Sequence, residues 1–175
     1  MTPGTGPIVM AVVLLATVVT ACSRGDGVID LRSPAFADGG VIPERFGCEG
    51  DNVSPPLSWS DVPDDATELA LVMADFDGPD GIFHHWVVLG IHPDVRSLGA
   101  GRLPDGAVLA QATSENAAYI GPCPPPGERH EYLFTLFPLR RELDLPEGVA
   151  TKEALDAIDA ARLPGEGELR GLMGG

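Results

Sequence analysis

Lysine and arginine are scarce in this chain. They number 11 against 26 aspartates and glutamates, which gives a formal charge of −15 over 175 residues, and they form no basic stripe. Because phosphate-rich backbones are held mainly by Lys and Arg, we expect no nucleic-acid partner. The acidity is instead typical of a protein that stays in solution and adheres weakly to other surfaces.

The sequence also lacks the short motifs of familiar enzymes. It contains no GxSxG turn, no GxxxxGK phosphate loop and no HExxH pair, and its cysteines have no local catalytic context. Ser54 and Ser58, in "NVSPPLSW", are typical of turn hydroxyls rather than nucleophiles. We therefore predict no catalytic residue and no cofactor.

A metal site is weakly indicated. The stretch "DFDGPDGIFHHWVV", residues 75–88, is rich in oxygen ligands, but an EF-hand counted from Asp75 meets proline at position 5 and tryptophan at position 12. His84 and His85 are neighbours on a predicted strand, so they point to opposite faces and do not share an ion. We predict no metal; one of these histidines with Asp75 and His130 is the open alternative.

The amino terminus predicts export. Residues 8–21, "IVMAVVLLATVVTA", form an uncharged run of 14 residues that is short for a bilayer span but typical of a signal-peptide core. The small residues before Cys22 and the polar "SRGDG" after it resemble a bacterial lipobox, which implies cleavage before Cys22 and acylation of its thiol. Residues 1–7 carry no Lys or Arg, which a start codon further upstream would explain. An ordinary cleaved signal that leaves Cys22 free is the alternative.

These features divide the chain into three parts. We expect a lipoprotein signal peptide over residues 1–21, the lipidated Cys22 with a linker over residues 22–29, and one folded domain over residues 30–175. The predicted location is the extracytoplasmic face of the cell membrane, reached through the lipid anchor.

Two cysteines, Cys48 and Cys123, remain inside the predicted domain. An exported protein is exposed to an oxidising environment, so an even pair favours one disulfide. The two cysteines are 75 residues apart. On the chain-entropy model, a disulfide that closes a loop of that length would contribute about 4 kcal/mol to the free energy of unfolding. The alternative is a pair of small buried apolar side chains.

The fold is predicted to be mainly β. Seventeen prolines and 22 glycines favour short strands joined by turns, and apolar density predicts strands over residues 69–75, 84–91 and 132–139. Residues 97–129 lack a sustained period and are predicted to be loop-rich. One helix is predicted, with Thr151 as its N-cap and its apolar face on Ala154, Leu155, Ile158 and Ala161.

Three separated segments resemble one family together. They are "CEGDNVSPPLSW" (48–59), "ADFDGPDGIFHHWVV" (74–88) and "GPCPPPGERHEYLFTLF" (121–137). In order and spacing they are similar to blocks of the bacterial phosphatidylethanolamine-binding proteins, also called Raf-kinase-inhibitor-like. The resemblance implies an antiparallel β-sandwich with a Greek-key element and one or two peripheral helices.

The resemblance also implies a small pocket at one end of the sandwich that takes anionic groups such as phosphate or the phosphoethanolamine head. Carried over by position, its lining would be Asp75, Asp77, His85, Gly121, Pro122, His130 and Tyr132. Two ionised aspartates repel an anion unless other donors hold them. A histidine beside a carboxylate becomes a cationic donor, loop N–H groups can hold an aspartate, and a phenol donates without adding charge.

The chain departs from the family pattern at three places. Glu131 stands where an Arg commonly follows the third-block histidine, and Phe76 replaces a proline. Strand alternation between His130 and Tyr132 predicts that Glu131 faces outward, where its charge matters little. The tail "LPGEGELRGLMGG" is irregular and lacks the family's histidine-bearing continuation, which puts closure of the pocket by this segment in doubt.

Three function classes follow from these residues. The leading hypothesis is a non-catalytic, lipid-anchored envelope protein whose pocket binds a small anion or a phospholipid head group. The second is a regulatory inhibitor or scaffold that docks an envelope protein partner. The third is a hydrolase with His85 or His130 as general base, for which the sequence offers no convincing nucleophile.

Overall fold

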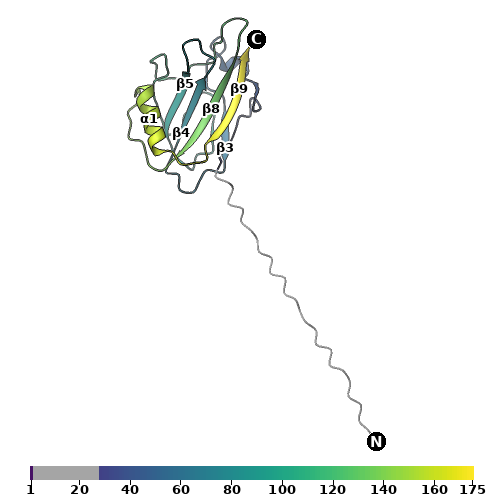
Figure 1. Ribbon diagram of the computed structural model, residues 1–175, viewed down its shortest axis with the longest axis vertical. Helices are drawn as coiled ribbons and strands as arrows, with labels where there is room; N and C mark the ends of the chain where they lie inside the picture. Colours follow the sequence, from purple (N-terminus) through teal and green to yellow (C-terminus); the bar gives the residue numbers. More distant parts are fainter. Residues whose placement is uncertain (2–27) are drawn as a thin grey trace.

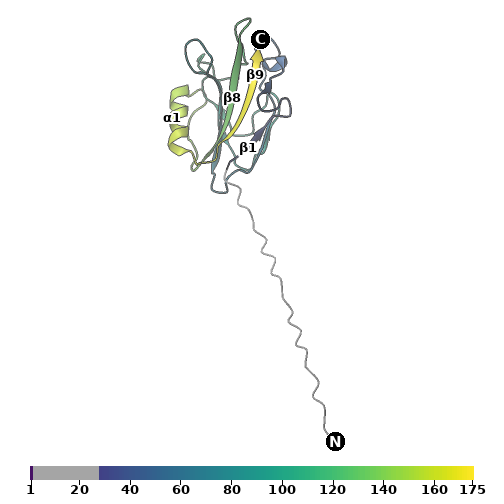
Figure 2. The same cartoon turned by 45° about the vertical axis from the view of Figure 1, so that its right-hand side comes forward.

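The computed structural model describes residues 28–175, together with Met1. Two β-sheets lie face to face, and one helix covers the outer face of the larger sheet (Figures 1 and 2). The prediction of a mainly β sandwich with a peripheral helix is confirmed. Apart from Met1, the predicted signal peptide, together with Cys22 and the linker up to residue 27, lies outside the described residues.

The sheets contain three and six strands. The small sheet has the order β1 (Asp30–Arg32), β3 (Leu57–Ser60), β6 (Ser97–Leu98), and the large sheet has the order β2 (Gly40–Val41), β9 (Gly167–Gly174), β8 (Arg129–Leu139), β4 (Glu68–Asp75), β5 (Phe83–Ile91), β7 (Val108–Leu109). Neighbours are antiparallel except β2 and β9, which are parallel. The three predicted strands correspond to β4, β5 and β8 and are confirmed.

Strand β4 is buried along its whole length. Leu71 and Met73 face the small sheet, while Ala70 and Val72 face the helix, because successive side chains of a strand point to opposite sides. A central strand covered on both faces needs the near-continuous apolar run found in "ELALVMAD". The two faces of this strand thereby join the two hydrophobic cores.

The helix α1 (Thr151–Ala161) packs on β5 and β8 through Ala154, Ile158 and Ala161, which are buried as predicted, while Leu155 is only partly buried. The predicted cap is wrong. Ala150 is the N-cap and caps with no side chain. The hydroxyl of Thr151 instead donates to the carbonyl of Gln111 at 2.7 Å, so it ties the helix to the loop beneath it. A short 3-10 helix, η1 (Glu44–Phe46), precedes β3.

The carboxyl-terminal tail is a regular strand, not the irregular segment that its composition indicated. Strand β9 lies between β2 and β8 and pairs with β8 from Gly167 to Gly174. Its glycines hide the apolar alternation on which strand prediction depends. At Gly171 a Cβ atom would collide with the side chains of Ile42 and Phe36, so close packing over the sheet requires glycine there.

The described segment that starts at residue 28 enters the sandwich at the pole remote from His130. The N–H of Ile29 donates to the carbonyl of Gly165, which lies just before the pairing of Gly167 with Leu136. His130 pairs with Met173 at the other end of β8, six residues or about 20 Å further along the strand. Figure 1 shows the two ends at opposite poles of the molecule. Neither helix of the described part is long and apolar enough to cross a membrane.

Candidate anion-binding site

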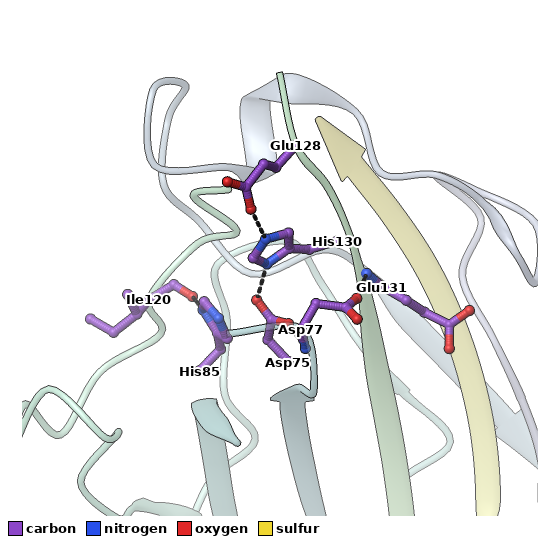
Figure 3. A network of polar contacts seen from close by, with 7 residues as sticks. All are labelled: Asp75, Asp77, His85, Ile120, Glu128, His130 and Glu131. Carbon is purple, nitrogen blue, oxygen red and sulfur yellow. Dashed lines mark hydrogen bonds and ion pairs between the residues drawn. The ribbon is translucent and has the colours of Figure 1, made fainter. Parts of the chain in front are cut away.

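The candidate site lies where three strands of the large sheet meet at one edge. Strand β4 ends at Asp75, β5 begins at Phe83 and β8 begins at Arg129, and because the strands are antiparallel these ends are adjacent. Asp75 is paired with Tyr132 in the register of β4 and β8. Figure 3 shows His130 above Asp75, with His85 on the next strand.

A β-bulge brings His85 into this group. Met73 pairs with Trp86, but the next residue of β4, Ala74, pairs with His84, so His85 is an extra residue on β5. Strict alternation along β5 would point the side chains of His85 and Trp86 to opposite faces of the sheet. Instead, Trp86 packs in the core between the sheets, and the His85 ring lies 5.2 Å from the Tyr132 ring of that core. Bulges re-aim side chains in this way beside functional sites.

The two aspartates are held by donors of the protein itself. Asp75 Oδ1 accepts a hydrogen bond from the N–H of Asp77 at 2.8 Å, and Asp75 Oδ2 accepts one from His130 Nδ1 at 2.7 Å. Asp77 Oδ2 accepts from the N–H of Glu131 at 2.8 Å. These contacts turn carboxylate oxygens toward hydrogen-bond donors of the scaffold, which lessens their repulsion of an external anion.

His130 is the histidine of the cluster whose surroundings favour the charged form. Its hydrogen bond to Asp75 raises its pKa above the ordinary histidine value, and contact with Glu128 acts in the same direction against the opposing effect of burial. Both ring nitrogens face carboxylates, since Nε2 lies 3.4 Å from Glu128 Oε2. In this arrangement both N–H groups of a doubly protonated His130 ring have a carboxylate acceptor, and the Nε2–H is the one nearer to the surface.

His85 has the opposite electrostatic environment. Burial lowers its pKa, which outweighs the raising effect of its hydrogen bond to Ile120. Its Nδ1 lies 2.7 Å from the Ile120 carbonyl, and because a carbonyl only accepts, Nδ1 carries the hydrogen. The neutral ring therefore offers Nε2 as an acceptor. The Phe83 ring, 4.6 Å away, packs against it.

Tyr132 supplies the buried polar group that lacks a partner. The residue is fully buried, and its hydroxyl makes no well-aligned hydrogen bond to any described residue, although the Cys123 backbone and the Asp75 side chain lie near it. Burial first, and the charge of Asp75 second, raise the pKa of this phenol, so it stays protonated. A buried hydroxyl without a partner carries a desolvation cost, which an external acceptor would remove.

The third block forms the wall beside these rings. The N–H of Gly121 donates to Asn52 Oδ1 at 2.8 Å, and a Cβ at Gly121 would collide with the Phe46 carbonyl and Asn52. The Pro122 carbonyl accepts from the N–H of Cys48 at 3.0 Å. Gly121 and Pro122 therefore attach the wall to the first block. The close approach to Asn52 explains why that position takes glycine.

The predicted disulfide is present, since Cys48 and Cys123 are bonded with their Cα atoms 5.4 Å apart. Sequence reasoning missed Asn52, Ile120 and Glu128. The position of Asn52 within the first block was an available signal. The contacts of the Ile120 carbonyl and of the Glu128 carboxylate leave no such signal in the sequence.

A cavity of about 750 Å³ adjoins the cluster. Its lining includes Pro122, Cys123, Glu128 and Met173. Of the seven predicted site residues only Pro122 is part of this lining, whereas Asp75, His85, His130 and Tyr132 are buried. The structure therefore brings the predicted polar side chains together beneath the surface, next to an open cavity rather than along its wall.

The two substituted positions point outward. Glu131 is half-exposed and lies 3.7 Å from Arg170 Nε of β9, away from His130. Phe76 is 56% exposed on the loop after β4. The outward placement of Glu131 agrees with strand alternation, and the position occupied by Arg in the family pattern lies on the surface here.

Comparison with known proteins agrees with this geometry. Residues 32–172 match the family profile described as phosphatidylethanolamine-binding protein. The chain belongs to the phosphatidylethanolamine-binding protein family. A UPF0098 protein of Methanothermobacter thermautotrophicus is 44% identical over 149 residues, covering 82% of this chain and 97% of that protein. A protein of Mycobacterium tuberculosis named as a lipoprotein, LppC, is 43% identical over 148 residues, covering 84% and 73%.

Solved structures of phosphatidylethanolamine-binding proteins share the fold. The homologue CT736 of Chlamydia trachomatis has a TM-score of 0.79 and 36% identity, covering 85% of this chain and 99% of that chain. YbcL of E. coli has a TM-score of 0.77 and 26% identity, covering 83% and 98%. The family and the sandwich predicted from the three blocks are thus confirmed.

The two buried histidines are expected to titrate in opposite directions. In an NMR pH titration, His130 should show a pKa above about 6.5 and His85 one below it. Asp75→Asn should lower the His130 pKa. Since the folded-state pKa of His130 is raised, its contribution to stability is present below pH 6.5 and declines as pH rises through that pKa. Equal pKa values for the two rings would contradict this electrostatic account.

The tyrosines beside the site provide a matched pair. Tyr132→Phe removes a hydroxyl that has no well-aligned partner among the described residues and should leave the free energy of unfolding unchanged or higher. Tyr119→Phe removes a hydroxyl that donates to the Phe46 carbonyl at 2.9 Å and should cost about 1 kcal/mol. Urea denaturation measures both. A loss at Tyr132 as large as that at Tyr119 would show that the Tyr132 hydroxyl has a partner.

Proposed function

We propose that this protein binds a small anion, such as phosphate or a phosphoethanolamine head group, at the site formed by Asp75, His85, His130 and Tyr132. The observation that carries the proposal is the buried Tyr132 hydroxyl, which has no well-aligned partner among the described residues and lies beside His130, whose pKa is raised. Family membership supports the class of function, which is binding of a small ligand without catalysis.

The charges of the cluster fit this role. Asp75 favours the protonated His130 ring, and its own two oxygens are already committed to His130 and to the backbone of Asp77. An anion that entered from the adjoining cavity would meet the His130 Nε2–H first, and the fully buried Tyr132 hydroxyl only after the surrounding side chains shifted to admit it. Neutral His85 offers an acceptor to a ligand oxygen that carries a proton. A monoprotonated phosphate group has both kinds of oxygen.

The contacts of the two histidines do not favour hydrolysis. Their ring nitrogens contact Ile120, Asp75 and Glu128. Within the described part of the chain, neither ring is thus hydrogen-bonded to a serine or to a free cysteine that it could activate. We infer that the histidines bind a ligand rather than act as general bases.

We also propose that Cys22 is lipidated after removal of residues 1–21 and anchors the protein on the outer side of the cell membrane. The relative LppC, named as a lipoprotein, supports this. Residues 23–27 can reach about 20 Å at most between Cys22 and Val28. Since the described chain begins at the pole opposite to His130, the site would point away from the anchoring bilayer. The anion would then arrive from the aqueous side.

One observation favours a second function, regulation of a protein partner. The loop between β4 and β5 carries Phe76 and Ile82, which are 56% and 51% exposed, and Phe76 directly precedes Asp77 in the sequence. Exposed apolar side chains at a ligand site are suited to contact with another protein. In this alternative, the protein is a scaffold or inhibitor whose docking surface adjoins the anion site.

Anion binding is tested by calorimetric titration with phosphate and with phosphoethanolamine. We expect millimolar or tighter binding, and a loss of at least tenfold in His130→Gln and in Tyr132→Phe, because each variant removes one donor. His92→Gln is the matched control, since His92 is exposed and, among the charged groups of residues 28–175, contacts only Asp94. Binding that is absent at millimolar ligand, or unchanged in both site variants, would refute the proposal.

Anchoring is tested by labelling cells with a fatty-acid analogue and separating membranes. The wild-type protein should carry the label and sediment with membranes, whereas Cys22→Ala should do neither, because the thiol is the acceptor of the lipid. Ser23→Ala, which changes the next residue and leaves the thiol, should behave as the wild type. Equal labelling of Cys22→Ala would rule out this anchor.

A further inference from the structure

Glu128 lies over the site at the point where an anion would approach His130. Its Oε2 is 3.4 Å from His130 Nε2, and Figure 3 shows the carboxylate above the ring, on the side opposite to Asp75. The His130 side chain is 6% exposed, whereas the Glu128 side chain is 62% exposed. The buried ring is thus contacted at its outer nitrogen by a surface carboxylate.

The other ionisable groups around His130 are held by the scaffold or buried; Asp75, His85 and Tyr132 are buried, whereas Asp77 is exposed. Asp75 is bonded to Nδ1, Asp77 is bonded to the backbone of β8, His85 is bonded to the Ile120 carbonyl, and Tyr132 is buried. The Nε2–H of His130 is therefore the ring donor that is not committed to the scaffold. Glu128 occupies it.

We propose that Glu128 is a tethered competitor of the external anion, which must displace this carboxylate from His130 Nε2 before it binds. The inference rests on the proposed function of the site. On this inference, Glu128 determines affinity and ligand preference. Its carboxylate does not itself donate a hydrogen bond to the bound anion.

The local structure allows the displacement. The Glu128 side chain is mostly exposed, so solvent and salt screen its ion pair with His130 and the pair holds that side chain only weakly. Glu128 follows Gly127, which has a φ of 81°, and its N–H closes a turn on the Pro125 carbonyl at 3.0 Å, so the backbone of the turn is fixed while the side chain is free to rotate. The adjoining cavity of about 750 Å³, which Glu128 lines, provides the space.

The displaced carboxylate would remain near the bound anion and would therefore influence which ligand the site prefers. A phosphate dianion is repelled by it, whereas the ammonium group of phosphoethanolamine can pair with it. Glu128 should therefore weaken binding of inorganic phosphate more than binding of a zwitterion. The effect on phosphate is expected to be roughly three- to tenfold for a unit charge at the rim of the site.

The test is calorimetric titration of the wild-type protein, Glu128→Gln and Glu131→Gln at one pH and one ionic strength. Glu131→Gln is the matched control, because it removes the same charge from a neighbouring side chain that lies beside Arg170. We expect Glu128→Gln to bind inorganic phosphate roughly three- to tenfold more tightly, with a smaller gain for phosphoethanolamine. Glu131→Gln should stay within about twofold of the wild type.

The NMR titration of His130 provides a readout that needs no ligand. Its pKa should fall in Glu128→Gln and stay unchanged in Glu131→Gln. Equal or weaker phosphate binding in Glu128→Gln, with binding retained in the wild type, overturns this inference and leaves the proposed function intact. Absence of binding in all three proteins overturns both. A pKa of His130 that is unaffected by Glu128→Gln also overturns the inference, because the contact would then be absent in solution.

Discussion

The buried hydrogen bond between Asp75 and His130 is the contact on which the candidate site depends. It joins the end of β4 to the start of β8, and it exists because the register of these strands sets Asp75 opposite Tyr132. The carboxylate favours a cationic ring where burial alone would favour a neutral one. Without that pairing, the cluster would present acidic groups to an anion.

The loops around the cluster serve to fix it. The disulfide of Cys48 and Cys123, together with the contact between Gly121 and Asn52, attaches the wall of the third block to the first block. The Ile120 carbonyl, which orients His85, belongs to the same wall. Three segments far apart in the sequence are thereby joined around one buried set of polar side chains, which is the arrangement that a preorganised binding site requires.

The high negative charge of the molecule is compatible with an anion site, because the groups that would contact the anion are hydrogen-bond donors even though the chain as a whole is acidic. A formal charge of −15 disfavours long-range attraction of an anion. Short-range hydrogen bonds from a protonated histidine and a phenol in a buried location are less screened than surface charges. In the proposed site, selectivity would be set by the few carboxylates within reach of the ligand, among them the exposed side chain of Glu128.

The family, the strands β4, β5 and β8, the cysteine pair and the residue types of the candidate site could be predicted from the chain alone, because apolar runs and motif spacing are local properties. Tertiary structure decided the rest. The bulge that re-aims His85, the pairing of glycine-rich β9 with β8, and the side chain of Glu128 over His130 each depend on a neighbour that is distant in sequence or on the conformation of a loop. Such contacts leave no periodic pattern in the chain, so they become visible only when the strands are in register.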